Sequence, residues 1–148
     1  MSEKIVVSGA SLKCSMGTAL AELFVHGESR SVGDSEKIIA NLTNISLINI
    51  VTPNMMIRPP FGDCLGTLCD SGDPLPCRPD IPIYWTPASL KFRCSEGKPA
   101  VKESSITFCA RGPGIIEIED PGQNVLIDTA RIQLNNIDGV WGILKGIH

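Results

Sequence analysis

The sequence predicts a small, mostly β protein. Its apolar residues fall in short segments, and 14 Gly and 11 Pro separate these segments, many in clusters typical of turns, such as "RPPFG" (58–62) and "EDPGQN" (119–124). The best helix candidate, residues 17–27, has only a weak helical pattern. Short apolar runs between turns are typical of antiparallel hairpins.

In chain order, the expected strands are residues 4–7, 45–51, 89–93, 105–109, 114–118 and 124–127. Most are short and lie close to the next strand, as hairpins require. The segment "GTALAELFVHG" (17–27) has Leu20, Leu23 and Phe24 at helical spacing. The same residues also fit a buried strand, so both structures stay open for this segment.

Composition bounds the size and the partners. A chain of 148 residues that is 43% hydrophobic has the length of one domain, and it can bury a core without disulfides. Its 13 basic and 16 acidic residues give a net charge of −3 without a Lys/Arg cluster, so nucleic acid is not an expected partner. No apolar run is long enough for a secretory signal or for a membrane span of roughly 20 residues. We therefore expect a soluble protein that stays in the cytoplasm or is exported without an N-terminal signal.

Three cysteines share a local pattern. Each of the stretches "SLKCSMG" (11–17), "FGDCLG" (61–66) and "TFCARGPG" (107–114) has a glycine two or three residues after its cysteine. We call these the three Cys-Gly units. They predict strand ends that turn sharply around something shared. In a reducing cytosol, such cysteines bind metal or lie in the core more often than they form lasting disulfides.

The central segment, residues 58–87, is rich in proline and contains Cys64, Cys69 and Cys77. A loop of this length in a compact domain is usually functional or held by a cross-link. A metal or a disulfide is the expected cross-link.

No catalytic pattern is apparent. The chain has only two histidines, His26 and His148, it has no G-x-S-x-G motif, and no Gly-Lys-Ser/Thr follows the "GPG" at 112–114. We therefore expect no enzyme, and the alternative is a small secreted metalloenzyme or hydrolase effector that uses the cysteine site. Tyr84 and Trp85 form either a stacking surface or a clamp that holds a loop on the core.

Four longer stretches carry a family resemblance, in order along residues 6–123. They are "VVSGASLKCSMGTA", "NISLINI" with "RPPFGDC", "PLPCRPDIPIYWTP", and "EGKPAVKESSITFCARGPGIIEIEDPGQ". Together they resemble the PAAR-like proteins, which are regarded as the tips of contractile injection machines. The combination of Lys-Cys-Ser-Met-Gly, Pro-Phe-Gly-x-Cys, Pro-Cys-x-Pro and Gly-Lys-Pro-Ala with a late cysteine is specific, although each motif alone is weak.

The resemblance implies a fold and a role. The fold would be a small cone of short β-hairpins with pseudo-threefold character over residues 1–124, followed by a C-terminal extension over residues 125–148. Such a cone would cap the trimeric β-helical spike of the valine-glycine-repeat type, in a type VI secretion system or a phage-tail-like particle, with one tip per trimer. The protein would be cytoplasmic when assembled, would be secreted or injected on firing, and would help to carry effector proteins.

The resemblance also implies a metal site. PAAR-type tips are associated with a structural zinc ion, and the cysteines in the matched motifs are Cys14, Cys64, Cys77 and Cys109. Four thiolates are a ligand set that zinc accepts tetrahedrally. Two alternatives stay open: buried thiols without metal, and disulfides that pair Cys14 with Cys109 and Cys64 with Cys77. Cys69 and Cys94 lie outside the motifs.

The extension, residues 125–148, is apolar and glycine-rich. Its apolar residues repeat at helical spacing, although its glycines weaken a helix; the repeating positions are Ala130, Leu134, Ile137, Trp141 and Leu144. The extension is expected either to dock on the spike or on cargo, or to pack on its own domain.

Overall fold

A computed structural model describes residues 3–26, 30–32, 37–53, 59–94, 97–126 and 132–134, and it is mostly β, which confirms the predicted fold class. The strands in the described residues are β1 (Ser11–Cys14), β2 (Ala21–Leu23), β3 (Arg30–Val32), β4 (Lys37–Ile38), β5 (Ile50–Val51), β6 (Asp63–Leu68), β7 (Pro74–Pro76), β8 (Thr86–Arg93), β9 (Pro99–Cys109), β10 (Gly114–Asp120) and β11 (Ile132–Leu134). All pair antiparallel.

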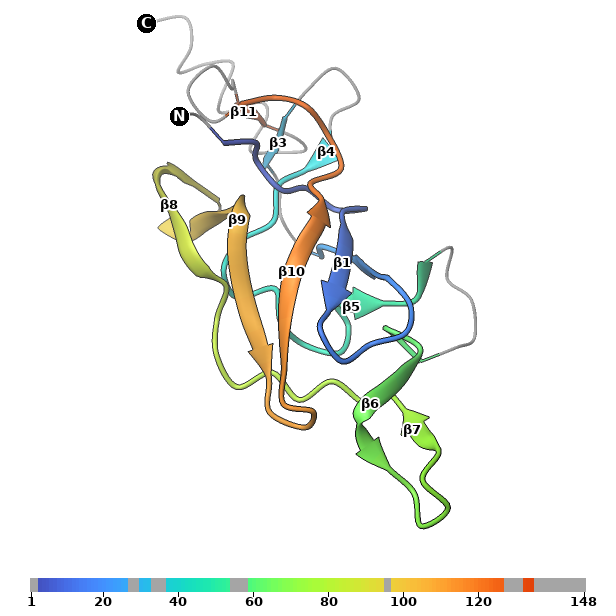
Figure 1. Ribbon diagram of the computed structural model, residues 1–148. Coiled ribbons are helices and arrows are strands. Elements are labelled where there is room, and N and C mark those ends of the chain that lie inside the picture. The colour runs from blue at the N-terminus through green and yellow to red at the C-terminus, as the bar shows by residue number, and fades with distance from the viewer. Residues whose placement is uncertain are drawn as a thin grey trace, which may run out of the picture.

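The largest sheet has six strands in the order β5-β2-β1-β10-β9-β8. Strands β9 and β10 form a hairpin in which Gly114 pairs with Cys109, and β1 lies on the other side of β10 with Cys14 opposite Ile116. This register places Cys14 and Cys109 at the same end of the sheet, where β1 and β9 finish (Figure 1). Two of the three Cys-Gly units therefore meet across one strand.

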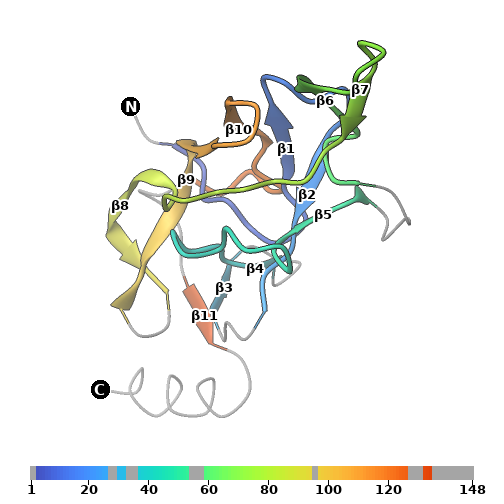
Figure 2. The same ribbon diagram turned by 90° about the horizontal axis from the view of Figure 1, so that it is seen from below.

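Two smaller sheets lie at opposite ends of the large one. The β6–β7 hairpin projects beyond the end where β1 and β9 finish, whereas β3, β4 and β11 lie at the other end (Figures 1 and 2). The sheets contain six, three and two strands, so strand pairing does not divide the described residues into three similar parts. The cone and its pseudo-threefold character stay predictions.

The core lies on one face of the large sheet. The largest fully buried side chains among the described residues are Trp85, Phe61, Ile5, Leu12, Leu23, Ile39, Ile50, Ile116, Val6, Val7 and Val101, and three of these, Ile5, Val7 and Ile39, belong to a second, smaller cluster. The indole N–H of Trp85 donates to the carbonyl oxygen of Asn44 at 3.0 Å, whereas Tyr84 is 57% exposed. Trp85 is thus a core residue that holds its loop, and the predicted alternative of a Tyr84–Trp85 stacking surface is wrong.

The segment 17–27 resolves as strand where it is described. Strand β2 is Ala21–Leu23, and the alternate residues Ala21, Leu23 and Val25 are buried. This period of two places one face of the segment against the core, so the helical alternative is wrong for this part of the chain. Gly27 lies outside the described residues.

Two predicted strands are largely replaced by other structure. In the segment 45–51, only Ile50–Val51 is strand, because Ser46 Oγ donates to Asn49 Oδ1 (2.8 Å) and Asn49 N–H donates to the carbonyl of Ser46 (2.9 Å). Such local side-chain bonds favour turns over strands. Residues 4–7 make isolated bridges to residues 126, 102 and 39 and form no continuous strand.

The predicted strand at 124–127 is wrong in its described part, where only Leu126 makes a bridge, to Lys4. Beyond it, the described part of the extension folds onto the domain. Strand β11 pairs with β3, and Ile132 lies opposite Val32. This short segment is strand, whereas the helical spacing predicted for residues 130–144 otherwise falls outside the described residues.

None of the described segments is a helix with the length and apolar character that crossing a membrane requires.

Candidate metal centre

The three Cys-Gly units, separated widely in sequence, lie together at one end of the large sheet. The N–H of Leu65 donates to the carbonyl of Met16 (2.7 Å), which joins the first unit to the second. The second unit touches the third so closely that a Cβ on Gly66 would lie 2.3 Å from the carbonyl oxygen of Gly112. The third unit returns to the first, since a Cβ on Gly114 would lie 2.8 Å from the sulfur of Cys14.

These contacts explain why glycine is needed at positions 66 and 114. A real Cβ is essentially never found within 3.0 Å of another heavy atom, so larger residues at positions 66 and 114 would force the units apart. The sequence pattern indicated sharp turns. The structure adds that these turns face each other and pack backbone against backbone.

Cys77 enters the same cluster from the β6–β7 hairpin. Its N–H donates to the carbonyl of Gly62 (2.8 Å), and Cys64 pairs with Leu75 two residues before it. The segment that follows Cys77 is tied to the third unit, because the N–H of Ala110 donates to the carbonyl of Asp80 (2.8 Å). The hairpin thereby brings both of its motif cysteines to the end of the large sheet.

The four motif cysteines are all buried, with exposed fractions of 6% for Cys14, 4% for Cys64, 6% for Cys77 and 4% for Cys109. The four thiols lie close enough together that a negative charge on a neighbouring sulfur raises the pKa of Cys14 and of Cys77. Burial raises the pKa of Cys77 to about 12, and the neighbouring thiols of Cys109, Cys14 and Cys64 add to the rise. Burial also raises the pKa of Cys14, and Cys109 and Cys64 again contribute.

Backbone N–H groups point at two of the sulfurs. The backbone amides of Met16 and Gly17, next to the Cys14 sulfur, oppose the rise of its pKa, and the Gly17 N–H also donates to the carbonyl oxygen of Cys14 at 3.0 Å. The amide of Asp80 donates to the Cys109 sulfur at 3.4 Å. Hydrogen bonds to a sulfur favour its thiolate form, which is the form that binds metal. The cluster thus combines a buried, apolar setting with donors suited to thiolates.

Thiolates are ligands that zinc accepts, but the four sulfurs are not arranged to hold an ion in this structure. In the part of the chain that the structure describes, no three His, Cys, Asp or Glu side chains are arranged so that they could hold a metal ion as they stand. A tetrahedral zinc site needs sulfurs about 2.3 Å from the ion. The segments that carry the four cysteines would therefore have to move closer together to bind a metal.

The structure also describes the cysteines of the two predicted disulfide pairs and the two cysteines outside the motifs, Cys69 and Cys94. All six cysteines are described and none is in a disulfide, so neither predicted pair, Cys14 with Cys109 or Cys64 with Cys77, is present. Cys69 lies at the far end of the β6–β7 hairpin, where Ser71 lowers its pKa through a hydrogen bond. Cys94 is fully buried in a second small core cluster with Ile5, Val7, Ile39 and Ala100.

A Gly66→Ala substitution is expected to destabilise the domain by about 1–3 kcal/mol, as overpacking does in other cores. The new methyl would meet the backbone of Gly112, which cannot move aside by a side-chain rotation. Urea unfolding measures the effect, and Leu65→Ala, at the exposed neighbour on the same strand, is the control. Equal midpoints for Gly66→Ala and the unchanged chain would show that the two units do not pack as described.

The pKa of Cys77 predicts how the metal-free chain responds to alkali. Below about pH 9, Cys77 keeps its proton in both folded and unfolded chains, and its full contribution to stability is present. Between pH 9 and about 12 the unfolded chain loses that proton while the folded chain keeps it, so stability falls as the pH rises. Each pKa unit corresponds to about 1.4 kcal/mol.

The measurement is urea unfolding of the unchanged chain and of Cys77→Ser, with a chelator present, at several pH values from 8 to 11. The series stops at pH 11 because both chains must still be folded before urea is added. Cys77→Ser should lose less stability over this window than the unchanged chain. Parallel curves for the two chains would contradict a raised pKa at Cys77.

Comparison with known families adds one finding. A family described as a domain of unknown function, DUF4280, matches residues 6–123, which include Cys14, Cys64, Cys77 and Cys109. The chain belongs to this DUF4280 family. The matched residues run from the first core segment to the end of the β10 region, so the three Cys-Gly units and the β6–β7 hairpin are all part of the DUF4280 domain. Searches of curated proteins and of solved structures found no match to this DUF4280 chain.

Proposed function

We propose that this DUF4280 protein is a non-enzymatic tip that caps the trimeric β-helical spike of a contractile injection system. The observation that carries the proposal is the cluster of four buried cysteines at one end of a small β domain. These four cysteines belong to the main hydrophobic core, and a bound metal would additionally tie together the segments that carry them. The family motifs and their order, described above, support the same role.

Zinc is the proposed metal, and Cys14, Cys64, Cys77 and Cys109 are its proposed ligands. Zinc held by four thiolates has no open position for a substrate, so its role would be to stabilise the fold. Within the chain, the backbone amides of Met16 and Gly17 would orient the Cys14 thiolate. The positive charge of Arg111 favours the thiolate of Cys77.

We propose that the outer face of β9 and β10 forms part of the surface that contacts the spike. Ile115 lies opposite Phe108, and Ile106 lies opposite Glu117 on the same face. Ile115 and Ile106 are 47% and 40% exposed. The turn at 45–49 exposes two further apolar side chains, Leu47 and Ile48. Apolar side chains that gather on an exposed face are typical of interaction sites.

The tip would be cytoplasmic during assembly and would leave the cell when the machine fires. One chain would serve one spike trimer, and effector proteins would travel on the same particle. The part of the extension beyond β11 is proposed to take part in docking.

Ile115→Glu is expected to weaken binding to a purified trimeric spike protein by about tenfold or more, because a carboxylate would be buried in an apolar contact. Size-exclusion chromatography with light scattering should show one tip per trimer, and calorimetry should give the affinity. Leu68→Glu, which charges an exposed leucine on the β6–β7 hairpin, is the matched control. No complex at micromolar concentrations, or a stable homotrimer of the tip alone, would contradict the proposal.

A further inference from the structure

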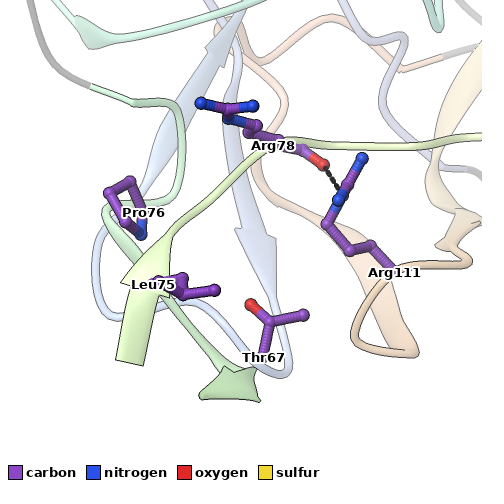
Figure 3. A pocket seen from close by; sticks show the side chains of 5 residues that line it. All are labelled: Thr67, Leu75, Pro76, Arg78 and Arg111. Carbon is purple, nitrogen blue, oxygen red and sulfur yellow. Dashed lines mark hydrogen bonds between the residues drawn. The ribbon is translucent and has the colours of Figure 1, made fainter. Parts of the chain in front are cut away.

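A pocket of about 300 Å³ lies beside the cysteine cluster, between the β6–β7 hairpin and the β9–β10 turn. Its lining residues are Thr67, Leu75, Pro76, Arg78 and Arg111 (Figure 3). The proposed spike tip uses none of these side chains, apart from the charge of Arg111 near Cys77. A volume of this size matches the small end of ligand sites, and it suits one short group with a side chain beside it.

Two arginines give the pocket its charge. The Nε–H of Arg111 donates to the carbonyl of Arg78 at 2.8 Å, which fixes the Arg111 side chain across the mouth of the pocket (Figure 3). Neither guanidinium forms an ion pair with a carboxylate of the described residues, where the ion pair found joins Lys102 to Glu3. Both arginines are exposed and keep donors available for an anion.

One buried hydroxyl in the pocket has no partner. The Oγ1 atom of Thr67 is inaccessible to solvent, and within the described part of the chain it makes no hydrogen bond. Figure 3 draws this oxygen on the side of Thr67 that faces the other lining residues. A buried hydroxyl without a partner lowers the stability of the fold.

The remaining wall is apolar. Leu75 and Pro76, at the end of β7, form it, and Leu75 is 42% exposed. The aspartates of the same hairpin, Asp63, Asp70 and Asp73, do not line the pocket, so a negative ligand meets no carboxylate there. The pocket therefore offers positive charge from two arginines and an aliphatic surface beside them.

We infer that this pocket binds the carboxylate of a peptide segment from a partner protein, with a neighbouring aliphatic side chain of the peptide on Leu75 and Pro76. The planar guanidinium groups of Arg78 and Arg111 match a carboxylate, which accepts their hydrogen bonds. The carboxylate belongs either to the C-terminus of the peptide or to an acidic side chain. The inference goes beyond the spike-tip proposal and stands without it, because it concerns the isolated chain and a peptide.

The test is an NMR titration of the full, reduced chain, with and without zinc. Three acetylated tripeptides serve as probes: Ala-Leu-Leu with a free C-terminus, Leu-Glu-Leu with a C-terminal amide, and Ala-Leu-Leu with a C-terminal amide. At least one of the two acidic peptides should shift the amide signals of Thr67, Leu75, Arg78 and Arg111 in a saturable way. The one that binds more tightly identifies the source of the carboxylate.

Matched variants separate binding from folding. Arg78→Gln and Arg111→Gln should each weaken the acidic peptide by about tenfold. Arg93→Gln, at an exposed arginine of β8, should leave the affinity unchanged. Thr67→Val should leave the affinity for the peptide unchanged, and it should raise the melting temperature of the free chain because the unpartnered buried hydroxyl is gone.

Several results would overturn the inference. These are the absence of saturable shifts with either acidic peptide, equal binding of the neutral amide, and displacement of the peptide by inorganic phosphate at equal concentration. A fourth is an Arg111→Gln variant that binds peptide normally but binds zinc less tightly, since it would assign Arg111 to the cysteine cluster alone. None of these results bears on whether the chain binds a spike.

Discussion

Cys77→Ser is expected to abolish zinc binding and to sharply lower the melting temperature of the chain in the presence of zinc. Structural zinc sites contribute on the order of 10 kcal/mol at neutral pH, and a serine hydroxyl is a poor substitute for a thiolate ligand. With a chelator present, the same substitution should have a small effect near pH 7, where the Cys77 thiol is protonated in both states. The large effect should therefore appear only when zinc is available.

Cys69→Ser is the matched control for this experiment. Cys69 lies on the same hairpin but outside the cluster, and its sulfur bonds to Ser71. Differential scanning fluorimetry with and without added zinc measures both chains. If zinc stabilises the Cys77→Ser and Cys69→Ser chains equally, the four-cysteine site is wrong.

Trp85→Ala is expected to destabilise the fold by about 3–5 kcal/mol, the usual range when a large buried aromatic side chain is removed from a core. Trp85 is 1% exposed, and its indole also satisfies the carbonyl of Asn44. The loss therefore combines a cavity with an unpaired buried carbonyl. Urea unfolding at neutral pH measures the change.

Two neighbours sharpen this prediction. Tyr84→Ala removes an aromatic side chain of similar size from a position that is 57% exposed, and it should cost less than about 1 kcal/mol. Trp85→Phe keeps most of the packing and loses the hydrogen bond, so its effect should lie between the two. A Tyr84→Ala effect as large as that of Trp85→Ala would contradict the assignment of Trp85 alone to the core.

Local sequence was enough to predict the strands whose turns are made by glycine and proline. The β9–β10 hairpin follows from two β-prone runs on either side of "ARGPG", and its predicted strands fall inside the observed ones. The segment 45–51 has an equally apolar composition, yet Ser46 and Asn49 turn most of it away from strand pairing. Apolar composition alone did not reveal that competition, although the two polar residues were visible in the sequence.

The candidate site was also predictable only in part. The repeated Cys-Gly units indicated that Cys14, Cys64 and Cys109 turn around something shared, but spacing could not show which strands bring them together. Strand β1 lies beside β10, and the N–H of Ile115 donates to Ser15 Oγ across 100 positions of sequence. Cys77 has no glycine unit of its own, and a backbone bond to Gly62 places it, which no local pattern predicts.

The pocket beside the cluster had no sequence signal. Arg78 and Arg111 lie close to Cys77 and Cys109 in sequence, but they read as scattered surface charges until the hairpin brings them to one pocket. Thr67 reads as an ordinary strand residue. Its missing hydrogen-bond partner becomes visible only in three dimensions.

Native mass spectrometry of the reduced chain, beside a denatured spectrum taken after thiol alkylation, tests the central claim most directly. We predict a monomer that carries one zinc ion and releases it when Cys14 is replaced by serine, and all six thiols should react with the alkylating reagent once the chain is denatured with a chelator. A metal-free monomer that takes up no added zinc would contradict this prediction. So would a chain whose four motif cysteines are already joined as two disulfides after purification in reducing buffer.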